Sequence, residues 1–413
     1  MNQPRSGPLA GLKVLDLSRI LAGPWAGQLL ADFGADVVKV ERPRVGDDTR
    51  AWGPPFLRDA SGAETNNAAY YMSANRGKRS ITLDFAAPEG QAVVRRLTER
   101  ADVLIENYKV GGLAKYGLDY PALKEVNPRL IYCSITGFGQ SGPYAHRTGY
   151  DLIAQAMGGI MSITGERDDL PGGGPQKVGV AAADLMTGMY AATAILAALA
   201  SLERTGQGQH IDLALLDTQV AWLANQAMNY LVGGEAPARA GNEHQNMVPY
   251  GVFATRDGHF ALAIGNNSQL RKFCDVAGCP ELPNDPRFAD NTARLRNRVE
   301  LIATLNDITR QRTLDEWSAL LEPVGVPCGP INSIDRVFDD PHVQARGMRV
   351  SVPHSLGVEV DYPANPIKFS ETPVDYPRAA PLLGEDCDTV LRDWLDLDDA
   401  GVAELRESDI GLD

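Results

Sequence analysis

The chain has 413 residues, more than one hydrophobic core normally serves, so the sequence predicts two domains. Lys and Arg total 39 against 53 Asp and Glu, and the resulting net charge of −14 argues against nonspecific binding to nucleic acid or to an anionic membrane. The five cysteines are scattered and the six histidines lack a metal-ligand spacing. We therefore expect a cytoplasmic protein without disulfides or a bound metal, and the N-terminal residues show no apolar stretch typical of a secretory signal.

Short apolar runs alternate with helical patterns over the first 135 residues. The runs at residues 13–17, 36–40, 102–105 and 130–135 predict buried strands. The periodic segments at residues 24–33, 88–100 and 121–126 predict the helices between them. Strand–helix–strand alternation indicates a parallel, doubly wound sheet, so we predict an α/β fold with a Rossmann-like large domain.

The later chain predicts a different organisation. Helical patterns cover residues 151–157, 184–203, 217–231 and 315–321, and residues 209–215 look extended. Residues 250–255 and 259–264 alternate around Arg256-Asp257-Gly258, which predicts a hairpin. We expect residues 1–224 to form the large domain, residues 225–325 a smaller α+β domain, and residues 326–413 to return to the large domain.

The segment from residue 185 to residue 202 contains no charged residue and has the minimum length of a membrane span. It is rich in alanine rather than leucine, and Asp184 stands directly at its start. This composition favours a helix buried in a soluble core or in a dimer over a membrane span.

The first predicted strand–helix turn, from Asp16 to Pro24, lacks the GxGxxG of a dinucleotide-binding domain, so the fold does not imply NAD. Basic residues instead gather near predicted strand and loop ends. Ligands of open α/β sheets bind beyond the carboxyl ends of the strands, where Arg and Lys suit phosphates. A solvated rim of surface charge is the alternative interpretation. These residues are Arg42, Arg76, Lys78, Arg79, Lys109 and Lys115.

Asp184 precedes the long Ala-rich segment, where an aspartate ordinarily caps a helix by accepting backbone N–H groups. The same N–H donors could instead keep the carboxylate ionised and oriented, and an ionised carboxylate can attack a thioester. Asp151 opens another helical segment, where a cap is again the simplest role, and Tyr150 before it could be a core aromatic residue.

Several segments together resemble CoA-transferase family III, the formyl-CoA and carnitine CoA-transferase family. They occur in the family's order along nearly the whole chain. The run TGYDLIAQAMGGIMSITG is most similar to members that use dicarboxylates, of the succinyl-CoA:glutarate type. The matching segments are LDLSRILAGPWAGQLLADFGADVVKVERP, GDDTR, NRGKRSITLD, ADVLIENY, CSITGFGQSGPY, RTGYDLIAQAMGG, ADLMTGMYAA, TGQGQHIDLALLD, GVPCGPI and APLLGE.

The resemblance implies that Asp184 is the nucleophile and that CoA passes between small carboxylic, here dicarboxylic, acids through an acyl-aspartyl anhydride. It implies a CoA thioester as substrate, no permanently bound cofactor, and an interlocked homodimer. Lys115 stands where some members have Arg, which would leave at best a monodentate phosphate contact. Tyr150 would lie near the thioester, beside Asp151. The implied CoA contacts are Arg42, Leu83, Ala86, Asn107, Tyr108 and Lys115.

The family also contains α-methylacyl-CoA racemases, which are the alternative function. Their His falls at the position of Tyr150, and a phenol with a pKa of about 10 is a poor base at neutral pH compared with an imidazole of about 6.5. Leu21 stands where formyl-CoA transferases place Gln, which argues against oxalate or formate as the substrate.

Overall fold

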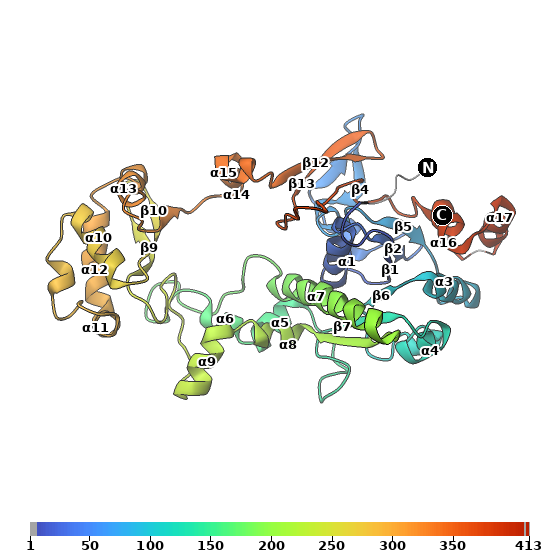
Figure 1. Cartoon of the computed structure of the whole chain (residues 1–413), viewed down its shortest axis with the longest axis horizontal. Coiled ribbons are helices and arrows are strands. Elements are labelled where there is room, and N and C mark those ends of the chain that lie inside the picture. Colours follow the sequence, from blue (N-terminus) through green and yellow to red (C-terminus); the bar gives the residue numbers. More distant parts are fainter. Residues whose placement is uncertain (1–5, 409, 413) are drawn as a thin grey trace. The chain divides into compact units, whose positions relative to one another are not determined.

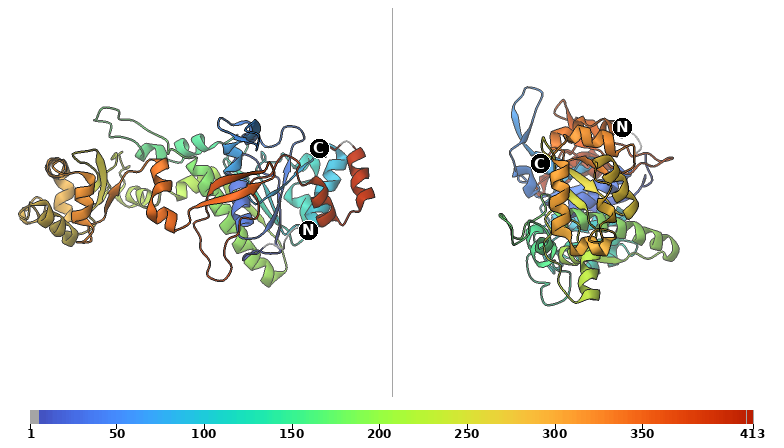
Figure 2. Two further views of the ribbon diagram at one scale, coloured as in Figure 1. Left: turned by 90° about the horizontal axis from the view of Figure 1, so that it is seen from above. Right: turned by 90° about the vertical axis from the view of Figure 1, so that its left-hand side faces the viewer.

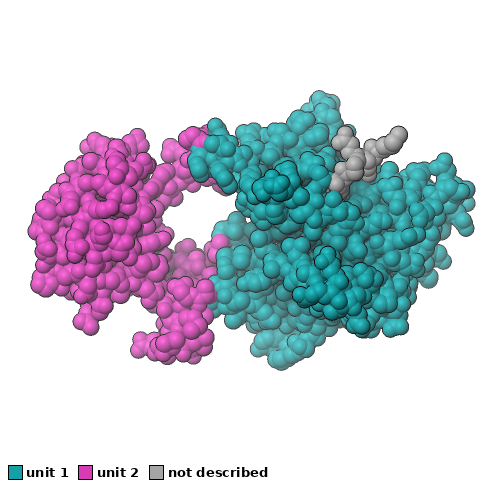
Figure 3. Space-filling model, in the orientation of Figure 1, with its two compact units in different colours: residues 1–159, 179–223, 342–413 teal, residues 160–178, 224–341 magenta. Residues whose placement is uncertain are grey.

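The computed structural model describes residues 6–408 and 410–412, and the chain divides into two compact units (Figure 3). Unit 1 comprises the residues up to Gly159, Gly179–Leu223 and the residues from His342 onward. Unit 2 comprises Ile160–Val178 and Ala224–Pro341. The sequence predicted a small domain of residues 225–325 and a return to the large domain from residue 326, whereas unit 2 continues to Pro341. Unit 2 also includes residues 160–178, where Arg239 donates to Ser162 O and pairs with Asp168.

A six-stranded parallel sheet of order β5-β2-β1-β6-β7-β8 forms the centre of unit 1 (Figure 1). It confirms the predicted α/β fold and all four strands expected in the first 135 residues, and the extended segment at residues 209–215 becomes β8. The strands are β1 (Lys13–Asp16), β2 (Asp36–Glu41), β5 (Arg79–Thr82), β6 (Val103–Glu106), β7 (Ile131–Thr136) and β8 (His210–Ala214).

Alternate residues of each strand face opposite sides of the sheet, so both sides are covered by apolar layers. On one side, Val14 and Val37 belong to a core shared with α1 (Ala22–Asp32) and α7 (Ala182–Thr205). On the other side, their neighbours Leu15 and Val38 belong to a core completed by four helices. These are α3 (Pro88–Arg100), α4 (Tyr120–Val126), α16 (Cys387–Leu395) and α17 (Asp399–Glu407).

The last part of the chain belongs to unit 1, and its helix α16 packs against α3 and β5. Figure 2 shows these C-terminal helices, in red, beside α3, in cyan. Trp394 is 1% exposed and donates its indole N–H to Asp36 on β2 at 2.8 Å. The C-terminal helices therefore supply part of the core of the sheet.

The long helix α7 packs against α1, α5, α8, β7 and β8. Within the described chain, α7 alone is long and apolar enough to cross a membrane, with a mean hydropathy of 1.7 over its best window, of which 39% is buried. The remaining elements of unit 1 are η1 (Asp48–Ala51), β3 (Phe56–Arg58), β4 (Glu64–Ala68), α2 (Ala69–Met72), η2 (Ala114–Tyr116), α5 (Asp151–Met157), α8 (Leu215–Ala221), β12 (Arg349–His354) and β13 (Val358–Pro363).

Unit 2 has a separate core, in which the rings of Phe260 and Phe273 stack on Trp317. The predicted hairpin is confirmed as β9 (Tyr250–Ala254) and β10 (His259–Ala263), with β11 (Cys328–Pro330) beside β10. The helices are α6 (Ile160–Ile163), α9 (Ala224–Gly233), α10 (Asn267–Ala277), η3 (Leu282–Asn284), α11 (Asn291–Arg296), α12 (Arg298–Thr309), α13 (Leu314–Leu321) and α14 (Ile334–Asp339). Helix α15 (Pro341–Ala345) lies at the boundary between the units.

Three of the basic residues are neither phosphate ligands nor a solvated rim, so both sequence interpretations were wrong for them. Arg76, Lys78 and Arg79 are buried. Each is held by an aspartate of α1, β1 or β2, and unpaired burial of a charge would cost several kcal/mol. The partners are Asp32 for Arg76 (2.7 Å), Asp16 for Lys78 (2.9 Å) and Asp36 for Arg79.

Candidate active site

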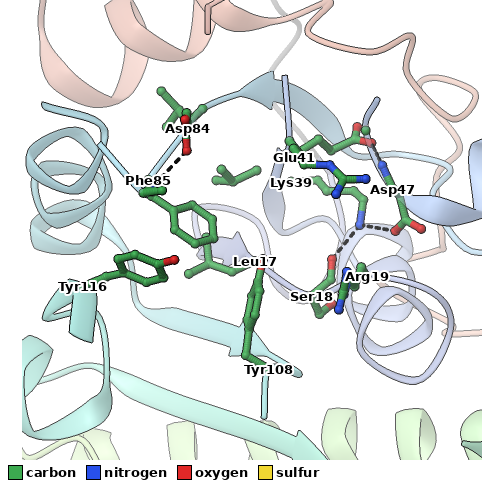
Figure 4. Close-up of a pocket in the computed structure, with 15 residues that line it drawn as sticks. Leu17, Ser18, Arg19, Lys39, Glu41, Asp47, Asp84, Phe85, Tyr108 and Tyr116 are labelled. Atoms are coloured by element: carbon green, nitrogen blue, oxygen red, sulfur yellow. Dashed lines mark hydrogen bonds and ion pairs between the residues drawn. The ribbon is translucent and has the colours of Figure 1, made fainter. Parts of the chain in front are cut away.

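A cavity of about 220 Å³ lies at the carboxyl ends of β1, β2, β5 and β6, where open α/β sheets bind ligands (Figure 4). Four of the residues that the sequence predicted to contact CoA line this cavity. They come from three different strand ends, so the sheet brings together residues far apart in the sequence. The four are Arg42, Leu83, Ala86 and Tyr108.

One wall of the cavity is aromatic. The ring of Phe85 meets Tyr108 and Tyr116 edge to face, each with a centroid separation of 5.8 Å (Figure 4). Edge-to-face packing fixes the rings relative to one another. Sequence reasoning missed Phe85 and Tyr116, although both flank residues that the family motifs identified.

The opposite wall is charged. Lys39 is buried, donates to Ser18 O at 2.7 Å and pairs with Asp47 at 2.9 Å, so this lysine holds the wall together rather than meeting solvent. Arg19 and Arg42 share Asp48 on the rim, at 3.2 and 3.7 Å, and their side chains are 48% and 60% exposed. Exposed ion pairs contribute little energy, so both guanidinium groups can exchange Asp48 for an anionic ligand.

The turn between β1 and α1 is held in a strained conformation beside the cavity. Ile20 has a φ of 70°, a region that β-branched residues seldom adopt. Its N–H donates to both carboxylate oxygens of Asp47, at 3.2 and 3.1 Å. Asn107 accepts from Arg19 N at 3.0 Å and donates to Arg19 O at 2.7 Å. Asn107, predicted to contact CoA, thus fixes this turn and with it the side of the cavity.

Buried charge beneath the same turn supports it. Asp16 accepts hydrogen bonds from Ser18 N (2.9 Å) and from Lys78 Nζ (2.9 Å), and Lys78 also donates to Pro24 O at the start of α1 (2.9 Å). Burial alone would raise the pKa of Asp16, but the charges of Lys78 and Lys39 outweigh it and lower that pKa. Burial lowers the pKa of Lys78 to about 8. The hydrogen bonds of this network link β1, α1 and the turn.

Asp184 lies in the first turn of α7 with its side chain partly buried. Among the described residues none donates a hydrogen bond to its carboxylate. Burial, and then the charge of Asp151, raise the pKa of Asp184 to about 7. The prediction that neighbouring N–H groups keep this carboxylate ionised was therefore wrong. The alternative that Asp184 is the N-cap was also wrong, because Ala181 takes that position.

Asp151 occupies the N–H groups that Asp184 was expected to use. Its Oδ1 accepts from Ala183 N at 2.8 Å and from Asp184 N at 3.3 Å, and its Oδ2 accepts from the side chain of Gln155 at 2.7 Å. Asp151 is thus a cap, as its sequence position suggested, but it caps α7 rather than its own helix α5.

Two glycines bring Asp151 to this position. Gly137 follows β7 and Gly149 precedes Tyr150, and a Cβ added at Gly149 would lie 2.4 Å from the Cα of Gly137. Only this close backbone contact lets the start of α5 sit against the end of β7. Tyr150 is 58% exposed, so the alternative of a core aromatic residue was wrong.

The nucleophile candidate does not line the cavity, but α7 leads towards it. A Cβ added at Gly188, one turn after Asp184, would lie 2.6 Å from the carbonyl oxygen of Ala22, where α1 starts after the strained turn. Burial, and then the charges of Asp184, Asp151 and the cavity residue Asp47, raise the pKa of Tyr70 on α2, so both regions lie within electrostatic reach of Tyr70. No sequence motif pointed to Tyr70.

Lys115 does not line the cavity. It is exposed, and its ammonium group lies 4.5 Å from the ring centroid of Tyr116. Within residues 6–408 and 410–412, no group of three His, Cys, Asp or Glu side chains could hold a metal ion. The chemistry available here is thus a carboxylate of raised basicity, a charged rim and an aromatic wall.

Comparison with known proteins shows the family to which the chain belongs. The model of CoA-transferase family III matches residues 9–387, so the chain belongs to CoA-transferase family III.

The chain is 54% identical over 381 residues to the succinate–glutarate CoA-transferase of Agrobacterium fabrum, covering 92% of this chain and 94% of that protein. It is 41% identical over 403 residues to the succinyl-CoA:glutarate CoA-transferase of Homo sapiens, covering 98% and 90%. The crystal structure of a CAIB/BAIF family protein from Brucella suis shares its fold, with a TM-score of 0.83 and 52% identity over 94% of this chain and all of that one. The resemblance predicted from the motifs is confirmed.

Proposed function

We propose that this enzyme moves CoA from succinyl-CoA to a small dicarboxylic acid such as glutarate, with Asp184 as the nucleophile. Two relatives named for succinate or succinyl-CoA and glutarate align over more than nine-tenths of the chain and support this choice of acids. The observation that carries the proposal is the state of Asp184, a partly buried carboxylate without a hydrogen-bond partner among the described residues and with a pKa raised to about 7. When ionised, such a carboxylate is more basic than an ordinary aspartate, and it attacks a carbonyl more readily.

The reaction proceeds through four acyl transfers. The Asp184 carboxylate attacks the thioester carbonyl and the C–S bond breaks. The CoA thiolate is the leaving group, and Asp184 now carries the acyl group as an acyl-aspartyl anhydride. The thiolate then attacks the Asp184 carbonyl and releases the donor acid as its carboxylate. The acceptor carboxylate attacks this aspartyl thioester and again frees the thiolate, which attacks the acceptor carbonyl to form the new acyl-CoA and restore the Asp184 carboxylate. No electron is transferred, and the thioester's free energy is kept as long as water is excluded.

CoA would bind across unit 1. The adenine ring would lie against Phe85, Tyr108 and Tyr116, with Leu83 and Ala86 at its edge, and Arg42 on the rim would meet the phosphates. Asn107 would hold the turn on which the nucleotide rests. The pantetheine arm would then follow the start of α1 to Asp184, with Tyr150 and Asp151 near the thioester. Lys115, on the outside of the aromatic wall, would contribute long-range charge alone.

A homodimer in the cytoplasm completes the proposal. Helix α7 exposes Met189, Tyr190 and Leu196, which are 41%, 43% and 37% exposed, and a second copy of the chain would cover this apolar face. Light scattering coupled to gel filtration tests the oligomeric state. We propose no permanently bound cofactor, because each of the four steps uses only Asp184 and the substrates.

The decisive experiment supplies succinyl-CoA with a panel of carboxylic acids and identifies the new CoA thioesters by mass spectrometry. We expect glutaryl-CoA from the wild type and no product from Asp184→Ala. Rapid quenching without an acceptor should show an acyl or CoA adduct on the peptide that carries Asp184. Asp217→Ala, a change on the neighbouring helix α8, is the matched control and should retain transfer. Exchange by a folded Asp184→Ala enzyme would refute the proposal.

The racemase alternative gains no support from the site, because Tyr150 stands at the position of the racemase histidine and a phenol is a poorer base than an imidazole. Incorporation of solvent deuterium at the α-carbon of a 2-methylacyl-CoA in the absence of acceptor acid would favour it.

A further inference from the structure

The first turn of α7 lacks a cap of its own. Ala181 at the N-cap position offers no side-chain oxygen, and the N–H groups at the start of a helix need acceptors. Asp151, which lies 32 residues before Ala183 on a different helix, accepts the N–H groups of Ala183 and Asp184 through one oxygen. Gln155, one turn along α5, holds the other oxygen. Asp151 is therefore fixed at both oxygens.

This arrangement has two consequences for Asp184. The backbone N–H of Asp184 is one of the two groups held, so Asp151 fixes the residue whose side chain carries the chemistry. It also brings a second negative charge within electrostatic reach of the Asp184 carboxylate, and this charge disfavours ionisation of Asp184. Helix N–H groups that ordinarily stabilise an anion are taken by Asp151, so Asp184 receives the repulsion without the compensating donors.

We infer that Asp151 is a positioning residue for the nucleophile: it holds the first turn of α7 and keeps a negative charge beside Asp184 that acylation relieves. This inference rests on the proposed function of Asp184. When Asp184 becomes an anhydride or a thioester it loses its charge, and the repulsion from Asp151 disappears in that step. The repulsion thus raises the free energy of the resting carboxylate and not that of the acylated enzyme, which favours acylation.

Among the charged groups near the start of α7, Asp151 has the main electrostatic effect on the Asp184 carboxylate. Burial is the larger cause of the raised pKa of Asp184, and Asp151 is the charged group that adds to it. Tyr70 of α2 also lies within electrostatic reach. The elements packed against α7 carry several further titratable groups. They are Asp32 on α1, Tyr132 and Cys133 on β7, His210 and Asp212 on β8, and Asp217 on α8.

The test separates charge from capping. Asp151→Asn keeps an oxygen that can accept the two N–H groups and removes the charge, whereas Asp151→Ala removes both. Glu99→Gln, on the exposed face of α3, is a control for the loss of one negative charge. The measurement is kcat/KM for succinyl-CoA between pH 5 and pH 9, with melting temperatures alongside.

In the wild type and in Glu99→Gln, kcat/KM should fall as the pH drops through about 7, where Asp184 becomes protonated. In Asp151→Asn this acidic limb should move to lower pH by about one unit, a tenfold change in the ionised fraction at the acidic end, while kcat/KM at pH 8.5 falls about tenfold. Asp151→Ala should in addition lower the melting temperature.

An Asp151→Asn profile that coincides with the wild-type profile would overturn the inference, as would an equal loss at every pH without a shift of the acidic limb. The proposed function is tested separately, because it fails only if Asp184→Ala still exchanges CoA. An inactive Asp184→Ala together with an unshifted Asp151→Asn profile would therefore refute the role of Asp151 alone.

Discussion

Replacing the nucleophile by its neutral isostere should stabilise the protein while abolishing transfer. In Asp184→Asn no charge remains in the partly buried site, and the repulsion from Asp151 is lost. A carboxylate whose folded-state pKa is raised penalises folding once it ionises. The penalty is absent below the unfolded-state pKa of 3.8, grows as the pH rises, and is complete above pH 7.

The size of the effect follows from the pKa difference. A rise from 3.8 to about 7 corresponds to about 4 kcal/mol above pH 7 for a fully desolvated carboxylate. Solvent reaches part of the Asp184 side chain, so screening reduces this to about 2 kcal/mol. At pH 5.5 about half of the penalty has developed, which leaves a difference of about 1 kcal/mol between pH 5.5 and pH 8.5.

Urea denaturation of both proteins at pH 5.5 and pH 8.5, at one fixed protein concentration, measures this difference. Asp184→Asn should gain more stability over the wild type at pH 8.5 than at pH 5.5. Glu99→Gln on the surface of α3 should show no such gain. A gain that is equal at the two pH values, or a destabilised Asp184→Asn, would refute the electrostatic account of the site.

Three further changes test how the site is built. Asn107→Ala removes both hydrogen bonds to the backbone of Arg19. The KM for acyl-CoA should therefore rise roughly tenfold, which corresponds to about 1.4 kcal/mol of binding free energy, with kcat nearly unchanged. An unchanged KM in steady-state assays would contradict the role given to this turn. Gly149→Ala places a Cβ against the backbone of Gly137 and should cost both activity and several degrees of melting temperature, and a fully active, equally stable variant would count against the close approach. Lys78→Met leaves the buried carboxylate of β1 unpaired and should destabilise the protein by about 3–5 kcal/mol in urea unfolding, whereas a loss below 1 kcal/mol would contradict it.

The central sheet could be predicted from the sequence because its strands are short apolar runs bounded by turns. Strand β5 was not predicted, because its residues Arg79–Thr82 are mostly polar and do not form an apolar run. They are buried all the same because polar partners meet them: Arg79 pairs with Asp36, and Ser80 donates to Glu41 at 2.6 Å. A polar strand of this kind becomes recognisable only when its partners are known.

The segment at residues 217–231 was predicted as one helix, and this prediction was wrong. The structure divides it into α8 and α9, and Ala224 at the break has a φ of 46°. No Gly or Pro marks this break, so helical periodicity continued across it. Tertiary structure, and not local preference, sets the conformation here.

Family motifs named Asp184 and the four residues that line the cavity, and the role of each in binding or catalysis stays a prediction. The environment of Asp184 was not predictable, because its neighbour Asp151 lies 32 residues before the N–H group it caps at Ala183. A cap is expected from the residue next to the helix, and Ala181 gives no hint that one exists. Electrostatic tuning of this kind depends on which helix ends meet, which is a property of the fold.

The dependence of the sheet on α16 and α17 bears on how the protein is made. One face of β1, β2 and β5 is covered by Val390, Leu391 and Trp394, which follow these strands by roughly 300 residues or more in the chain. While the nascent chain grows, that face stays open for most of translation, and the apolar strands remain exposed to other chains. The apolar core on this face of the sheet therefore cannot be completed before α16 and α17 have been synthesised, and chaperones that shield apolar strands should raise the yield of the enzyme.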